Sequence, residues 1–233
     1  MQFQQKLSYG KAPSRQSSAP TSDVTVPYAD RRGAGRALAQ FLNHHKEQHS
    51  VMVLALPRGG VPVGYEVAQA LRVPLDVFVV RKLGVPGQEE LAMGAIASNG
   101  ARVLNAEVMK ALHIPSDVLE SVTRRERLEM QRREQLYRGE QAPLVVREQC
   151  VIVVAVPVAA AETCRAFANE ADEIVCAATP QPFRAVGLWY DDFSETSDSE
   201  VRELLSRAAN PVSHDPMSHD SASVEETNPE GIE

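Results

Sequence analysis

The sequence predicts an α/β fold, and three observations support that prediction. The run Val51–Leu56 is apolar throughout, which is typical of a strand buried in a parallel sheet. A proline, an arginine and two glycines follow it, and then an apolar pattern with helical spacing reaches Leu71. Finally, 233 residues with 43% hydrophobic and 24% charged side chains suit one globular domain with tails.

The turn after this first strand is a candidate anion site. Arg58, Gly59 and Gly60 lie between the strand and the helix that Pro62 opens, where the N–H that proline lacks is not needed. Amide groups at a helix N-terminus attract anions, and an arginine fork matches phosphate oxygens. Glycines allow close approach to a phosphate or a positive φ. The alternative is a tight strand–helix turn with a solvated arginine.

A helix is expected before this unit, over Asp30–Leu42, with Asp30 as its N-cap. Three histidines follow it: His44, His45 and His49. The four-residue spacing of the last two would suit a shared metal, and an exposed polar helix end is the alternative. We assign no metal-binding residues.

Redox state and location are predicted from the cysteines. Cys150, Cys164 and Cys176 are odd in number and lack metal-ligand spacing. We expect buried, reduced thiols in a cytoplasmic protein.

A second strand is predicted over Pro74–Val80, and it leads into a cationic pair. Arg81 and Lys82 follow the strand and precede a loop rich in glycine and proline. Open α/β sheets bind ligands at the carboxyl ends of their strands, so this pair is a second candidate site. An exposed basic turn is the alternative.

The remaining elements follow from local patterns. Asn99-Gly100 predicts a hairpin joining strands at 89–98 and 102–104, and Asn105 is expected to cap a short helix to Leu112. A long helix from Ser116 to about Arg138 carries charges of both signs, which indicates a solvated face rather than a nucleic-acid surface. Further elements are expected at 150–158 (strand), 162–171 (helix), 173–177 (strand) and 199–208 (helix, capped by Ser197 and Asp198).

The two ends of the chain differ in composition from its middle. We expect a disordered arm over 1–27, one domain over 28–209 and a disordered acidic tail over 210–233. The net charge is −7, and most of it lies in that tail, so the body is near neutral and nucleic acid is not an expected partner. No signal peptide or membrane-spanning run is recognised, so no membrane partner is expected either.

Four strings together resemble the bacterial type I phosphoribosyltransferase family. They are Leu-Pro-Arg-Gly-Gly-Val-Pro-Val from Leu56, Val-Val-Arg-Lys-Leu-Gly from Val79, Glu-Leu-Ala-Met-Gly-Ala from Glu90 and Phe-Arg-Ala-Val-Gly-Leu-Trp-Tyr-Asp-Asp-Phe from Phe183. The resemblance implies a doubly wound parallel sheet with a small hood. It also implies transfer of a 5-phosphoribosyl group from phosphoribosyl pyrophosphate (PRPP) to a nucleobase or amine, with Mg²⁺.

The resemblance also implies roles for particular residues. Arg58, Gly59 and Gly60 fall on the pyrophosphate-binding loop of the family. Arg81 and Lys82 fall where a catalytic flexible loop would close over the pyrophosphate. The hood residues that help to hold the nucleophile would be Trp189, Tyr190 and Phe193.

One signature of the family has no match in this chain. The family carries two acidic residues and a turn rich in glycine and threonine that bind the ribose and its 5′-phosphate, after a strand like Cys150–Val154. Here that strand continues to Val158, so we expect that one central strand-loop-helix unit of roughly 30 residues is missing. The alternatives to an active transferase are therefore an inactive phosphate- or nucleotide-binding regulatory relative, or a damaged reading frame. Whether the chain forms a homodimer is left open.

Overall fold

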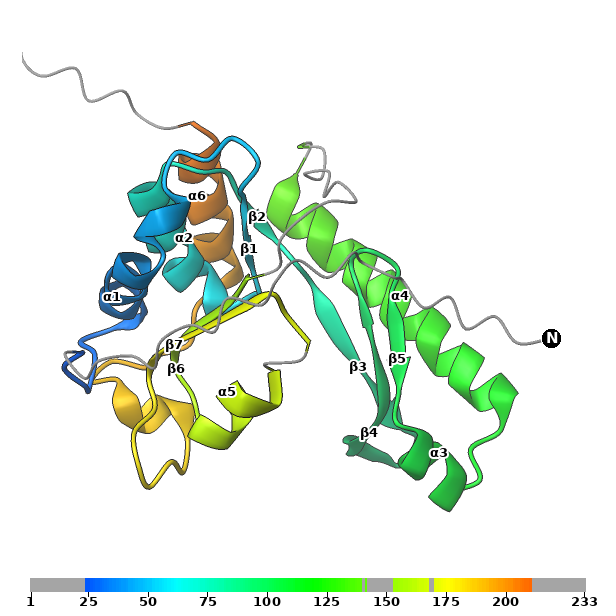
Figure 1. The fold of residues 1–233 in the computed structure, drawn as a ribbon. Coiled ribbons are helices and arrows are strands. Elements are labelled where there is room, and N and C mark those ends of the chain that lie inside the picture. The colour runs from blue at the N-terminus through cyan, green and yellow to red at the C-terminus, as the bar shows by residue number, and fades with distance from the viewer. Residues whose placement is uncertain (1–23, 140, 142–152, 168–169, 211–233) are drawn as a thin grey trace, which may run out of the picture.

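The computed structural model describes residues 24–139, 141, 153–167 and 170–210 (Figure 1). The elements are α1 (Arg31–Phe41), the 3₁₀ turn η1 (Asn43–His45), β1 (Val53–Ala55), α2 (Gly60–Leu71), β2 (Leu75–Val77), β3 (Val80–Val85), β4 (Gln88–Ala97), β5 (Arg102–Leu104), α3 (Ala106–Ala111), α4 (Ser116–Arg138), β6 (Val153–Val158), α5 (Ala161–Phe167), β7 (Glu173–Ala178), the 3₁₀ turn η2 (Val186–Trp189) and α6 (Asp198–Ala209).

The first strand, β1, pairs in parallel with β2. The register places Val53 opposite Leu75 and Ala55 opposite Val77. The strand is shorter than predicted, and Leu54 is 38% exposed. The expectation of a strand buried on both faces is therefore wrong for β1, because among the described residues it has a strand neighbour on one side alone.

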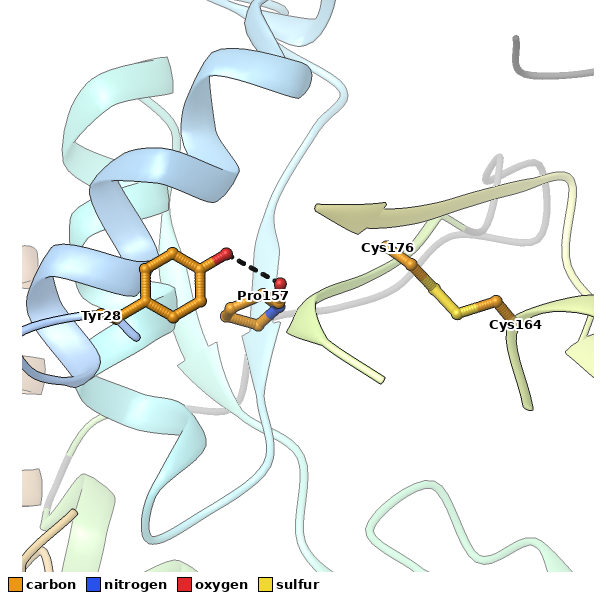
Figure 2. Close-up of a disulfide and its surroundings, with 4 residues drawn as sticks. All are labelled: Tyr28, Pro157, Cys164 and Cys176. Atoms are coloured by element: carbon orange, nitrogen blue, oxygen red, sulfur yellow. Dashed lines mark hydrogen bonds between the residues drawn. A yellow bond between two sulfur atoms is a disulfide. The ribbon is translucent and has the colours of Figure 1, made fainter. Parts of the chain in front are cut away.

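A second parallel pair, β6 and β7, carries helices on both faces. Val175 and Ala177 of β7 are buried against α1 and α2. The alternate residue Cys176 faces α5, since successive side chains of a strand point to opposite faces, and it forms a disulfide with Cys164 (Figure 2). The expected α/β architecture with parallel strands is confirmed. The expectation of reduced thiols is wrong for these two cysteines, because the strand–helix packing brings their sulfur atoms together.

The third sheet is antiparallel, with the order β3-β4-β5, and α4 packs along it (Figure 1). The predicted hairpin at Asn99-Gly100 is confirmed, and Gly100 has the positive φ of 82° that such a turn requires. Arg81 and Lys82 lie in β3, opposite Ile96 and Ala95. Their predicted place at the mouth of a loop is wrong, because cross-strand pairing with β4 extends the strand through them.

The largest core joins this antiparallel sheet to the β1–β2 pair. Helices α4 and α6 contribute buried side chains to it, among them Val122, Met130, Val201 and Leu204, and α2 contributes Val61. The carboxyl ends of β1 and β2 therefore lie in one body with the β3–β4 hairpin and both long helices.

Several expectations fall wholly or partly outside the described residues. These are the arm, the acidic tail and the strand start at Cys150. The junction at which a unit was expected to be missing, Val154–Ala155, lies inside the continuous strand β6. Of the arm, Val24 and Val26 are described, and both pack against the cluster around Tyr28. The predicted helix to residue 171 ends earlier, since Glu170 lies in a turn. No helix of the described part is long and apolar enough to cross a membrane.

Candidate anion-binding site

The Arg58–Gly60 turn joins β1 to α2 as predicted, but its amides are partly used within the turn. The amide of Gly60 donates to the carbonyl of Leu56 and that of Val61 to the carbonyl of Arg58, both at 3.0 Å. Pro62 has no N–H. The amides of Arg58 and Gly59 have no backbone acceptor among the described residues, so they are the ones that an anion would meet.

Gly59 has an ordinary helical conformation, with φ −62°, so its glycine is not explained by a positive φ. The reason is steric. A Cβ on Gly59 would lie 3.0 Å from Nε of Arg31. The absence of a side chain at Gly59 therefore lets a second arginine lie against the loop.

Arg31 is the site residue that the sequence analysis missed. It begins α1, and its Nη1 donates to the carbonyl of Ser194 at 2.5 Å. Its guanidinium also stacks 4.0 Å from the ring centre of Phe193. The one local signal was its position directly after the helix cap Asp30, and nothing in the sequence tied it to a glycine 28 residues later.

A polar recess of about 120 Å³ lies between the N-termini of α1 and α2 and the segment that precedes α6. It is lined by Asp30, Arg31, Arg32, Pro62, Asp192, Ser194, Glu195, Thr196 and Glu200. This volume is below the roughly 300–1,000 Å³ of ordinary small-molecule pockets. Four carboxylates and two guanidinium groups line it, and Arg58, Gly59 and Gly60 do not, so the recess is not itself a preformed anion site.

Arg58 is itself engaged by carboxylates. Its Nη2 forms an ion pair with Glu195, and its Nη1 lies 3.9 Å from Oδ1 of Asp198. Asp198 also accepts a 2.9 Å hydrogen bond from the hydroxyl of Tyr137. Burial, and after it this hydrogen bond, raises the pKa of Tyr137, which keeps its hydroxyl a donor. An anion at Arg58 must therefore displace Glu195.

Arg81 and Lys82 follow β2, the strand paired with β1, but they lie in β3 of the separate antiparallel sheet. Arg81, however, donates two hydrogen bonds to Oε2 of Glu126 on α4, at 3.0 and 2.6 Å. Lys82 contacts the fully exposed Glu90 at 3.1 Å. Arg81 thus fastens the hairpin to α4, whereas Lys82 can exchange its partner readily.

The three hood residues form an aromatic contact with the segment before α1. Tyr190 is buried, with its ring 5.5 Å from Tyr28 and 4.9 Å from Phe193. Trp189 accepts from the amide of Tyr28 through its carbonyl, and its buried indole Nε1 has no partner in the described structure. This packing places Phe193 under Arg31 and so helps to position that arginine.

Tyr28 also connects this aromatic cluster to the parallel pair β6–β7. Its hydroxyl donates to the carbonyl of Pro157 on β6 at 2.9 Å (Figure 2). Burial, and then the neighbouring Tyr190, raises the pKa of Tyr28 to about 12. The hydroxyl therefore stays protonated and can donate this bond throughout the neutral pH range.

The described residues do not fit a protein-held Mg²⁺. This ion prefers several oxygen ligands in octahedral geometry. Three of the four carboxylates that line the recess have other partners: Asp30 caps α1, Asp192 accepts from the amide of Ser194, and Glu195 pairs with Arg58. Glu200 alone would give the ion too few ligands. In the described part of the chain, the group of metal-binding side chains that converges is His44, His45 and Glu173, which is a different site.

Comparisons with known proteins agree on one family. Residues 30–154 match the family model described as the phosphoribosyl transferase domain. Two Mycobacterium tuberculosis proteins, each named "Putative phosphoribosyl transferase" (strains CDC 1551 and H37Rv), are 42% identical over 208 residues, covering 78% of this chain and 47% of each relative. The chain thus spans about half the length of the curated relatives that it matches.

A solved structure is similar as well. The crystal structure of TT1426 from Thermus thermophilus matches with a TM-score of 0.59 and 32% identity, over 76% of this chain and 97% of that one. With the family match over more than half of its residues, the chain belongs to the phosphoribosyl transferase domain family.

Proposed function

We propose that this protein binds the pyrophosphate group of PRPP, or pyrophosphate itself, at the Arg58–Gly60 turn and does not transfer the phosphoribosyl group. The observation that carries the proposal is the contact of Arg31 with Gly59, the residue that follows Arg58 in the turn after β1. Two guanidinium groups and two loop amides can together meet several oxygens of a pyrophosphate. Charge-assisted hydrogen bonds of this kind contribute roughly 1.5–3 kcal/mol each.

The ion pair between Arg58 and Glu195 is compatible with such binding. The Glu195 side chain is 75% exposed, so the pair is well hydrated. Exposed pairs contribute about 0–1 kcal/mol, which is less than the gain from a charged phosphate contact. Pyrophosphate is therefore expected to displace Glu195 from Arg58, and this competition should reduce the affinity for pyrophosphate only modestly.

The absence of transfer rests on the second half of the expected site. The acidic string that would hold the ribose and its 5′-phosphate has no counterpart in the sequence. The family match ends at Val154, inside β6. The alignment to the mycobacterial relatives spans 208 positions, whereas the 78% of this chain that it covers is about 182 residues. About 26 positions of the relatives are therefore aligned with no residue of this chain. These observations support the loss of one strand-loop-helix unit.

The alternative is an active phosphoribosyltransferase with a nucleobase or amine as acceptor. Family membership and the cations Arg58, Arg81 and Lys82 favour it. Trp189, Tyr190 and Phe193 would then lie near the acceptor. Release of pyrophosphate from PRPP separates the two functions. Mg²⁺, a cytoplasmic location and a homodimer remain predictions that accompany the family.

Calorimetric titration with pyrophosphate tests the binding part of the proposal. We expect Arg58→Ala to weaken binding by roughly 1.5–3 kcal/mol, about tenfold to a hundredfold, because it removes a charged donor. Arg184→Ala is the matched control, since Arg184 is exposed and lies outside the recess. If the wild type and Arg58→Ala bind pyrophosphate with equal affinity, the turn has a structural role alone.

A further inference from the structure

A cluster of side chains that could bind a metal ion lies away from the Arg58–Gly60 turn. His44 and His45 of η1 and Glu173 at the start of β7 converge, with their ligand atoms all within 4.8 Å of one another. They come together although 128 and 129 residues separate the histidines from the glutamate. None of the three belongs to the site described above.

The distances within this cluster match those of a metal site. Nε2 of His44 and Nε2 of His45 each lie 3.2 Å from Oε2 of Glu173. A tetrahedral zinc has Zn–N and Zn–O bonds of roughly 2.0–2.2 Å, which places neighbouring ligand atoms about 3.3–3.5 Å apart. The same 3.2 Å contacts also fall at the long end of N–H···O hydrogen bonds, which span roughly 2.7–3.2 Å. The cluster is thus close to the spacing that a bound ion would impose.

The two imidazole rings lie close together although their positions in the 3₁₀ turn would direct them apart. Successive residues of a 3₁₀ turn point about 120° apart, because the turn has three residues. The rings of His44 and His45 nevertheless lie 4.0 Å apart, centre to centre, and both face the same carboxylate oxygen. A carboxylate that two imidazoles share offers a cation two neutral nitrogen ligands and one negative oxygen.

The backbone that carries these side chains is held in place. The amide of His45 donates to Leu42 at 2.9 Å, and the side chain of Gln48 donates to the carbonyl of His44 at 2.7 Å. Glu173 is fixed by its register opposite Val153 in the parallel pair. The side chains of His45 and Glu173 are 15% and 19% exposed, and that of His44 is 49% exposed. The ligands are therefore positioned by secondary structure, with one side open to solvent.

We propose that His44, His45 and Glu173 form a zinc-binding site that links the end of α1 to the start of β7. Two imidazoles and one carboxylate are a known ligand set for Zn²⁺, with the remaining position taken by water. The bound ion joins two elements far apart in the sequence and so stabilises the folded chain. This site is independent of the pyrophosphate proposal.

Titration of the full chain with Zn²⁺ alone tests this site, after treatment with a chelator and without reductant, so that the disulfide stays closed. We expect one site. His45→Ala and Glu173→Gln should each weaken it at least about tenfold, since even loss of an outer-shell partner has an effect of that size. His44→Ala, at an exposed position, should do the same without disturbing the fold.

Two controls distinguish this site from other histidines. His49→Ala changes an exposed neighbour that is outside the cluster. A double variant, His214→Ala with His219→Ala, removes the two histidines of the acidic C-terminal stretch. Both should bind Zn²⁺ like the wild type. Failure of the wild type to bind, unchanged binding in the three cluster variants, or loss in the tail variant alone would overturn the proposal.

Discussion

Glu195 lies where an anion would approach Arg58. The two side chains form an ion pair in the absence of any ligand, and Glu195 is exposed enough to move away. The negative charge here therefore competes with the phosphate oxygens for Arg58.

Glu195→Gln should tighten pyrophosphate binding. The exposed pair is worth about 0.2–1 kcal/mol, so the expected gain is up to about fivefold in affinity. The gain should shrink at high ionic strength, because salt screens the competing charge. Glu203→Gln, which removes an exposed glutamate paired with Arg207 on α6, is the control. Weaker binding in Glu195→Gln would mean that Glu195 positions Arg58 instead of competing for it.

Residues whose role is local could be predicted, and residues whose role depends on distant partners could not. Asp30, Asn105 and Ser197 each accept from an amide three residues ahead, as their N-cap patterns indicated. The pairing of Arg81 with Glu126 spans 45 positions, and the contact of Arg31 with the Gly59 turn is equally non-local. No periodicity or spacing in the sequence encodes such pairs.

At the scale of elements, the C-terminal end of α4 holds β2 in place. Arg138, the last residue of α4, donates to Oδ1 of Asp76 and to the carbonyl of Val77, each at 2.8 Å. The two side chains are 11% and 8% exposed. This contact fixes the strand that pairs with β1, and β1 carries the anion-binding turn.

Arg138→Ala should destabilise the fold strongly. The variant loses two buried hydrogen bonds from the guanidinium, to Asp76 and to the carbonyl of Val77. Hydrogen bonds to charged groups each contribute roughly 1.5–3 kcal/mol to the free energy of unfolding. Arg132→Ala on the same helix is the control, since the Arg132 side chain is exposed and ion pairs of exposed side chains contribute little to stability. Urea denaturation of both variants measures the difference. Equal midpoints would show that the Arg138 contact does not hold β2.

Helices and the hairpin were predicted better than the strands. The bounds of α4 and the turn at Asn99-Gly100 agree with the structure because capping, charge pairing and turn chemistry are properties of neighbouring residues. Strand β1 is shorter than its apolar run, and β3 includes residues expected in a loop. The length of a strand depends on the neighbouring strand with which it pairs. That neighbour cannot be identified from the sequence of one strand alone.

For the whole molecule, the parallel strands that the structure describes are divided between two sheets. The described strands form two separate parallel pairs, β1–β2 and β6–β7, and not one continuous sheet. The junction at which the unit was predicted to be missing, Val154–Ala155, lies inside β6, which is continuous from Val153 to Val158. Family and fold class could be predicted from four short strings. The division into pairs could not, since it depends on contacts between elements that are far apart in the sequence.

The central claim is that the chain keeps the pyrophosphate half of a phosphoribosyltransferase site without the ribose half. The most direct measurement is release of pyrophosphate from PRPP by the purified chain, with Mg²⁺ and a panel of nucleobases and amines, beside calorimetric binding of pyrophosphate to the same sample. The account predicts binding that depends on Arg58, with pyrophosphate release no faster than in a sample without protein. Acceptor-dependent release of pyrophosphate above that background would contradict it.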